Sequence, residues 1–163
     1  MLKYSEFVEL TESLDIDVGD IKRDSGLEMM SRLMLPESTH DSIRVLYNKH
    51  MDDNNLRLIK FKNDHGQIEY HIHNTAMMPG FKSGNISKLG FMSAAKMIHD
   101  DGTKELAAGN HLRFQSVDGS DQHAKYVAMI ERLAAKSGRT VKHVGVLPIT
   151  SAPFMQGETI LVQ

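Results

Sequence analysis

The sequence contains no cysteine and no tryptophan, and both absences exclude classes of chemistry. Without cysteine the chain has no disulfide, no thiolate nucleophile and no cysteine-based zinc site. With no tryptophan, four tyrosines and six phenylalanines, a platform for stacking nucleic-acid bases is not expected. The net charge of −2 provides no basic footprint for nucleic acid either.

The sequence also lacks long apolar runs. None approaches the roughly 18 residues of a membrane-spanning helix, so we expect no membrane partner. The opening residues, MLKYSEFVEL, carry Glu6 and Glu9 among the apolar positions, which argues against a secretory signal. With 163 residues, of which 40% are hydrophobic and 25% charged, the chain suits one globular domain with its own core.

What the sequence does contain is a regular succession of helix and strand patterns after Pro36. Residues 37–51, ESTHDSIRVLYNKHM, have the spacing of a helix capped by Ser38 or Thr39. Residues 56–75 alternate apolar and polar side chains around NDHG and predict a β-hairpin. The later patterns predict a helix at 87–99, a strand at 111–117, a helix at 120–137, and strands at 140–147 and 158–163 joined by a loop.

The order of these elements predicts the fold class. From residue 56 it is β-β-α-β-α-β-β, which indicates an α+β fold with a central mixed, largely antiparallel sheet flanked by helices. In this interpretation residues 37–163 form a single domain, and residues 1–36 form an amino-terminal segment. Within that segment, residues 13–28 are rich in Asp, Gly and Ser, and the acidic stretch DIDVGD at 15–20 is interpreted as a solvated linker.

The stretch HLRFQSVDGSDQHAKYVAMIERLAAKSGRTVKHVG, residues 111–145, combines a strand, a helix ending in a basic-glycine turn, and a second strand. With the glycine-containing loop that precedes it, this order resembles the GNAT family of acyl-CoA N-acyltransferases over residues 56–163. The resemblance implies acetyl-CoA bound in a splayed sheet. It also implies transfer of the acetyl group to an amine of a small molecule or a protein.

The resemblance assigns a place to the pyrophosphate of acetyl-CoA. In the family it lies where a glycine loop opens a helix, because oriented backbone amides favour anions there. The matching loop is PGFKSGNISKLG, residues 79–90, and its candidate cofactor-binding residues are Gly80, Lys82, Ser83, Gly84, Asn85, Ser87 and Lys88. The family's general-acid tyrosine lies partway along the last helix. Tyr126 lies about one turn before the matching position, which is Met129 or Ile130.

Residues 68–75, IEYHIHNT, place Glu69, His71 and His73 at every second position and therefore on one face of a strand. Acyl transfer to an amine needs a base, and histidine or glutamate tuned toward neutral pH can serve. In the acyltransferase fold this strand borders the thioester. The three residues, with Tyr126, are therefore candidate catalytic residues; the alternative is a solvated sheet face without catalysis.

Two further hypotheses use the histidines differently. His71 and His73 form an H-x-H pair that would suit zinc if His65 or His143 supplied further ligands. The segments HDSI and HNTA, which begin at His40 and His73, resemble the paired motifs of two-histidine phosphodiesterases. In those enzymes one histidine acts as the base and the other as the acid.

Residues 1–12, MLKYSEFVELTE, resemble the delivery peptides of proteins packaged in the heads of large myophages. A prohead protease cuts such peptides after the Glu of a Leu/Ile-x-Glu motif, which here would be Glu12. The resemblance implies a phage protein located in the virion, in the host cytoplasm, or in both. It also keeps a non-enzymatic alternative open: an internal head or host-takeover protein that binds a bacterial target.

Overall fold

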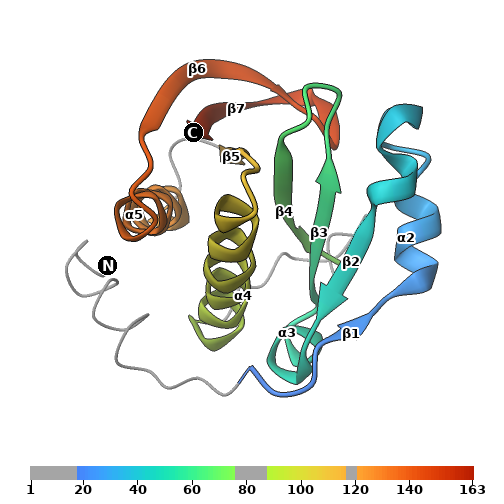
Figure 1. Ribbon diagram of the computed structural model, residues 1–163. Helices are drawn as coiled ribbons and strands as arrows, with labels where there is room; N and C mark the ends of the chain where they lie inside the picture. Colours follow the sequence, from blue (N-terminus) through green and yellow to red (C-terminus); the bar gives the residue numbers. More distant parts are fainter. Residues whose placement is uncertain (1–17, 76–87, 117–120) are drawn as a thin grey trace.

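The computed structural model describes residues 18–75, 88–116 and 121–163 (Figure 1). In chain order the elements are β1 (Lys22–Arg23), α2 (Ser25–Ser31), the 3-10 helix η1 (Glu37–Ser42), β2 (Arg44–Tyr47), α3 (Lys49–Asp53), β3 (Leu56–Lys62), β4 (Ile68–Asn74), α4 (Lys88–Ala107), β5 (Leu112–Ser116), α5 (Asp121–Lys136), β6 (Val141–Ile149) and β7 (Ala152–Val162). The strands form one sheet in the order β1-β2-β3-β4-β5-β7-β6. Each neighbouring pair is antiparallel except β4 and β5, which are parallel. The predicted α+β class, with a mixed and largely antiparallel sheet, is therefore confirmed.

The main hydrophobic core lies between one face of the sheet and the helices α4 and α5 (Figure 1). Alternate strand residues such as Tyr70, Leu112 and Phe114 point into it and are at most 1% exposed. From α5, Ile130 and Leu133 are buried as the predicted stripe requires. Each such side chain contributes about 1.5–3 kcal/mol relative to an exposed one. The helix predicted at 120–137 is therefore confirmed: it is α5.

A smaller hydrophobic core lies on the opposite face of the sheet, between the sheet and the helices α2 and η1. Its buried residues are Leu35, Ile43, Val45, Ile59 and Phe61, with Leu27 packed against them. β1 extends the same sheet by pairing with β2, so the sheet includes residues on both sides of the boundary expected at residue 36. Residues 22–28, in the stretch rich in Asp, Gly and Ser, form β1 and the start of α2.

The predicted helix over 37–51 does not form. This segment contains η1, then the strand β2, then the short helix α3. Ile43 and Val45 alternate with exposed Arg44 and lie in the smaller core, which requires an extended backbone. Asn48 then caps α3, because its side-chain oxygen accepts a hydrogen bond from the backbone N–H of Met51 at 2.9 Å.

The other predicted helix and strands form with changed boundaries, but the last predicted loop does not. The hairpin predicted at 56–75 is confirmed as β3 and β4, which pair from Leu56↔Asn74 to Lys62↔Ile68. The helix predicted at 87–99 continues to Ala107. The loop predicted between the last two strands is wrong, because β6 and β7 pair almost to their tip and leave only Thr150 and Ser151 in the turn.

Candidate functional site

Strand β4 places Glu69 and His71 on the sheet face that α4 and α5 do not cover. Between them Tyr70 points into the main core, as strand alternation requires. The Glu69 residue is 0% exposed and the side chain of His71 is 9% exposed. The alternative of a solvated sheet face is therefore wrong for these two residues.

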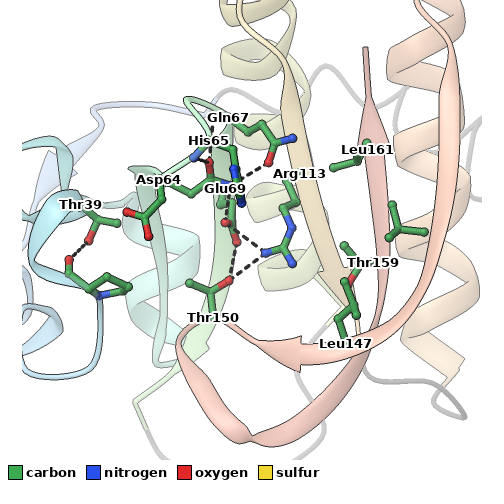
Figure 2. Close-up of a pocket in the computed structure, with 13 residues that line it drawn as sticks. Thr39, Asp64, His65, Gln67, Glu69, Arg113, Leu147, Thr150, Thr159 and Leu161 are labelled. Atoms are coloured by element: carbon green, nitrogen blue, oxygen red, sulfur yellow. Dashed lines mark hydrogen bonds and ion pairs between the residues drawn. The ribbon is translucent and has the colours of Figure 1, made fainter.

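The buried carboxylate of Glu69 is hydrogen-bonded at both oxygens (Figure 2). Its Oε1 accepts from His71 Nε2 at 3.0 Å and from Thr150 Oγ1 at 3.0 Å. Its Oε2 accepts from Asn63 Nδ2 at 2.8 Å and from Arg113 Nη1 at 3.3 Å. Four donors, from the β3–β4 turn, β4, β5 and the β6–β7 turn, therefore converge on one carboxylate, as a buried charge requires.

These partners determine the protonation state of Glu69. Burial on its own would raise the pKa of the carboxyl group, because a low-dielectric site disfavours the charge. The hydrogen bonds from His71 and Asn63 and the positive charge of Arg113 outweigh burial and hold the pKa of Glu69 below its usual range. Glu69 is therefore an anion at neutral pH.

The imidazole of His71 bridges Glu69 and the tip of the β6–β7 hairpin. Its Nε2 lies 3.0 Å from Glu69 Oε1, and its Nδ1 lies 3.2 Å from Ser151 Oγ. Because a carboxylate only accepts, Nε2 carries a proton, and in that tautomer Nδ1 is the ring atom that can accept from the Ser151 hydroxyl. The ring also stacks on Phe61, with centroids 5.3 Å apart, so its plane is fixed.

The hairpin tip is held over the sheet by polar contacts to β5. The side-chain oxygen of Gln115 accepts from the backbone N–H of Thr150 at 2.9 Å, and its Nε2 donates to Pro148 O at 2.9 Å. Arg113 Nη1 donates to Thr150 Oγ1 at 2.9 Å. These bonds position the two-residue turn that brings Ser151 to His71.

A cavity of about 330 Å³ opens beside this cluster (Figure 2). This volume falls at the small end of ligand sites, which span roughly 300–1,000 Å³. Its lining combines the charged pair with an apolar wall from the last two strands. The lining residues are Pro36, Thr39, Asn63, Asp64, His65, Gln67, Glu69, Arg113, Val144, Leu147, Thr150, Thr159 and Leu161.

A second feature lies where β4 and β5 separate. Their parallel ladder contains only two pairs, Ile68↔Leu112 and Glu69↔Arg113, although both strands continue. The hydroxyl of Tyr126, from α5, donates to the backbone oxygen of Tyr70 at 3.4 Å. Tyr70 is thus the first β4 residue beyond the ladder, and Tyr126 lies at the point of separation.

Burial raises the pKa of Tyr126, and the nearby charge of Glu69 raises it further. The hydroxyl therefore stays protonated and can act only as a donor or a neutral acceptor near pH 7. Tyr126 is 6% exposed and its ring meets Phe114 edge-on, with centroids 6.0 Å apart. The predicted candidate is consequently held rigidly at the separation of the two strands.

His73 lies on the same face of β4 as Glu69 and His71 but outside their hydrogen-bonded cluster. Within the described part of the chain its ring has no hydrogen-bonding partner and is half-buried. Burial lowers the pKa of His73 below the ordinary 6.5, because the charged ring is poorly solvated. At neutral pH His73 is an unprotonated base.

The predicted cofactor loop falls almost entirely outside the described residues. Gly80, Lys82, Ser83, Gly84, Asn85 and Ser87 are not among them, and Lys88 is the first residue of α4. The cleavage site expected after Glu12 lies outside them too.

The histidines of the other hypotheses have different partners. His143 Nδ1 lies 3.0 Å from Glu158 Oε1, and His40 Nε2 lies 3.0 Å from the backbone oxygen of Leu35. Among the residues that the structure describes, no group of three His, Asp or Glu side chains is arranged to hold a metal ion. His40 lies in η1, so HDSI is not part of a strand opposite HNTA.

Nothing in the sequence marks Arg113, Thr150 or Ser151 as site residues. They lie 44 to 81 positions from their partners on β4 and enter the cluster only through the pairing of distant strands. A weak signal exists in the dipeptide Thr150–Ser151, since hydroxyl residues are common in turns.

In the described ranges, no helix is long and apolar enough to cross a membrane. Comparisons with protein-family models, with curated proteins and with solved structures found no match to this chain.

Proposed function

We propose that this chain is an acyl-CoA-dependent N-acyltransferase with a GNAT-like fold, which transfers an acetyl group to an amine. The observation that carries the proposal is the short parallel ladder between β4 and β5. The ladder between the two strands ends at Glu69 and Arg113, and a buried tyrosine hydroxyl donates to the backbone oxygen of the next β4 residue, Tyr70. A splayed sheet of this kind is the expected place for the acyl carrier.

Two features of the chain support acetyl-CoA at this position. The ladder between β4 and β5 ends at Glu69↔Arg113, and the end of this ladder is where an extended ligand would lie against β4. The loop that joins β4 to α4 contains the candidate pyrophosphate residues of the sequence, including Gly84. Acetyl-CoA supplies the activated acetyl group as a thioester.

Two side chains suit the proton transfers. Tyr126 approaches the end of the ladder from the helix-covered face, and its raised pKa keeps a proton available for a departing sulfur. His73 lies on the opposite face with a lowered pKa, so it can take a proton from an incoming ammonium. The proposed acid and the proposed base therefore lie on opposite faces of the sheet.

The first test is turnover. With acetyl-CoA and a panel of small amines and lysine peptides, we expect amine-dependent release of free thiol. Tyr126→Phe should slow this release about 10- to 100-fold, because a hydrogen bond to developing charge is worth about 1.5–3 kcal/mol. Tyr47→Phe, which removes a hydroxyl from β2, is the control and should be unaffected.

A rate of thiol release that does not depend on any of the added amines would contradict the proposal. Equal rates for Tyr126→Phe and wild type would remove the tyrosine from the mechanism.

A specific observation favours a second candidate, the non-enzymatic binding module. Around α2, Met29 and Met30 are each 61% exposed and Leu33 is 89% exposed. Flexible, polarisable methionines on a surface are typical of sites that bind protein partners. This candidate predicts partner binding without any affinity for coenzyme A.

A further inference from the structure

The side chains of Ser151, His71 and Glu69 form a continuous hydrogen-bonded chain that the proposed acyltransferase does not use. Ser151 Oγ lies 3.2 Å from His71 Nδ1, and His71 Nε2 lies 3.0 Å from Glu69 Oε1. A hydroxyl, an imidazole and a carboxylate in this order are the parts of an activated serine. We propose that Ser151 is a nucleophile that attacks acyl esters or thioesters, with His71 as its general base.

The geometry meets the requirements of that role. A nucleophile and its base must lie within about 2.6–3.2 Å of one another, and a third group must orient the base. Glu69 is that third group: it is an anion, and its own position is fixed by Asn63 and Arg113. Its charge stabilises the imidazolium that forms when His71 takes the proton of Ser151.

The position of Ser151 makes the hydroxyl reachable. It lies in the two-residue turn between β6 and β7 and is only half-buried, whereas Glu69 is fully buried. Its neighbour Thr150 lines the cavity of about 330 Å³, whose wall includes Val144 and Leu147. This apolar wall suits a short acyl group, so the expected substrates are esters or thioesters of short-chain acids.

The reaction balances with water as the only co-reactant. Ser151 Oγ bonds to the carbonyl carbon while its proton passes to Nδ1 of His71. The bond from that carbon to the alcohol oxygen or thiol sulfur then breaks, and His71 returns the proton to the leaving group. Water, deprotonated by His71, next attacks the acyl-serine, which releases the carboxylic acid and restores the Ser151 hydroxyl.

A fluorophosphonate probe tests this proposal on the full chain without coenzyme A. Such a probe forms a phosphorus–oxygen bond with an activated serine and loses fluoride, and the modified residue is mapped by peptide mass spectrometry. We expect one labelled residue in the wild type, Ser151. Ser151→Ala should abolish labelling, and His71→Ala should slow it about 10²–10⁴-fold, the usual contribution of a general base.

Ser116→Ala, which removes a hydroxyl from β5, is the matched control and should label like the wild type. Melting temperatures of all variants verify that each is folded. An unlabelled wild type, or labelling that persists in folded Ser151→Ala or at full rate in folded His71→Ala, would overturn the proposal. The labelling experiment does not test the acyltransferase proposal, because no acyl-CoA takes part in it.

Discussion

Replacing Glu69 by alanine is expected to lower the free energy of unfolding by about 3–5 kcal/mol, the cost of removing one partner from a buried ion pair. Arg113 and His71 would keep their places in the sheet but lose the carboxylate that they contact at 3.3 and 3.0 Å. Urea denaturation at neutral pH measures the loss. Glu131→Ala, on an exposed part of α5, is the control and should change stability little.

The contribution of Glu69 to the free energy of unfolding should change with pH in one direction. The pKa of Glu69 is lower in the folded chain than its ordinary value of 4.5, so the carboxylate stabilises the fold above that pH. This contribution is lost as the pH falls through the folded-state pKa. The stability difference between wild type and Glu69→Gln should therefore shrink below pH 4.5; a difference that stays constant there would contradict the ionised state.

The second large effect is expected from His73→Ala. If His73 is the base for the amine, its loss should lower the rate of acetyl transfer about 10²–10⁴-fold and leave coenzyme A binding intact. Because burial lowers the pKa of His73, the wild-type rate should already be level at neutral pH and fall only below about pH 6.5. His111→Ala, at an exposed position just before β5, is the control.

A rate that is unchanged in His73→Ala would remove this residue from the mechanism. A rate that falls together with coenzyme A affinity would show a binding role instead of a basic one.

The parts of the fold with one clear period could be predicted from the sequence. The hairpin of β3 and β4 alternates strictly and is closed by a turn with Gly66 at φ 77°, which favours glycine. Helix α5 has a continuous apolar stripe and ends before Gly138 at φ 65°. In both cases the local pattern and the tertiary burial agree.

Residues 37–51 show how the same method fails. Ile43, Leu46, Tyr47 and His50 have helical spacing, but Ile43 and Val45 also alternate, and the smaller core favours the second pattern. A strand needs only a few residues, so η1, β2 and α3 fit within a stretch that one helix could have occupied. Tertiary packing against Ile59 and Phe61 decided between the two.

The candidate site could be predicted only in part for the same reason. The period of a strand placed Glu69 and His71 on one face, and the sequence suggested a solvated face or a catalytic one. Their burial depends on the long β6–β7 hairpin, which was predicted as two short strands and a loop. Pro148 suggested that loop, yet β6 is an edge strand, where proline is tolerated, and the pairing shifts register beside it.

A calorimetric titration with coenzyme A tests the central claim most directly. We expect saturable binding to the wild type and to Gly26→Val, since Gly26 lies exposed on α2. Gly84→Val should abolish binding, because a β-branched side chain blocks close approach of the loop backbone to a diphosphate and disfavours positive φ. Binding by the wild type that Gly84→Val removes is the predicted result. No binding of coenzyme A to the folded wild type would contradict the acyltransferase account and favour the binding module.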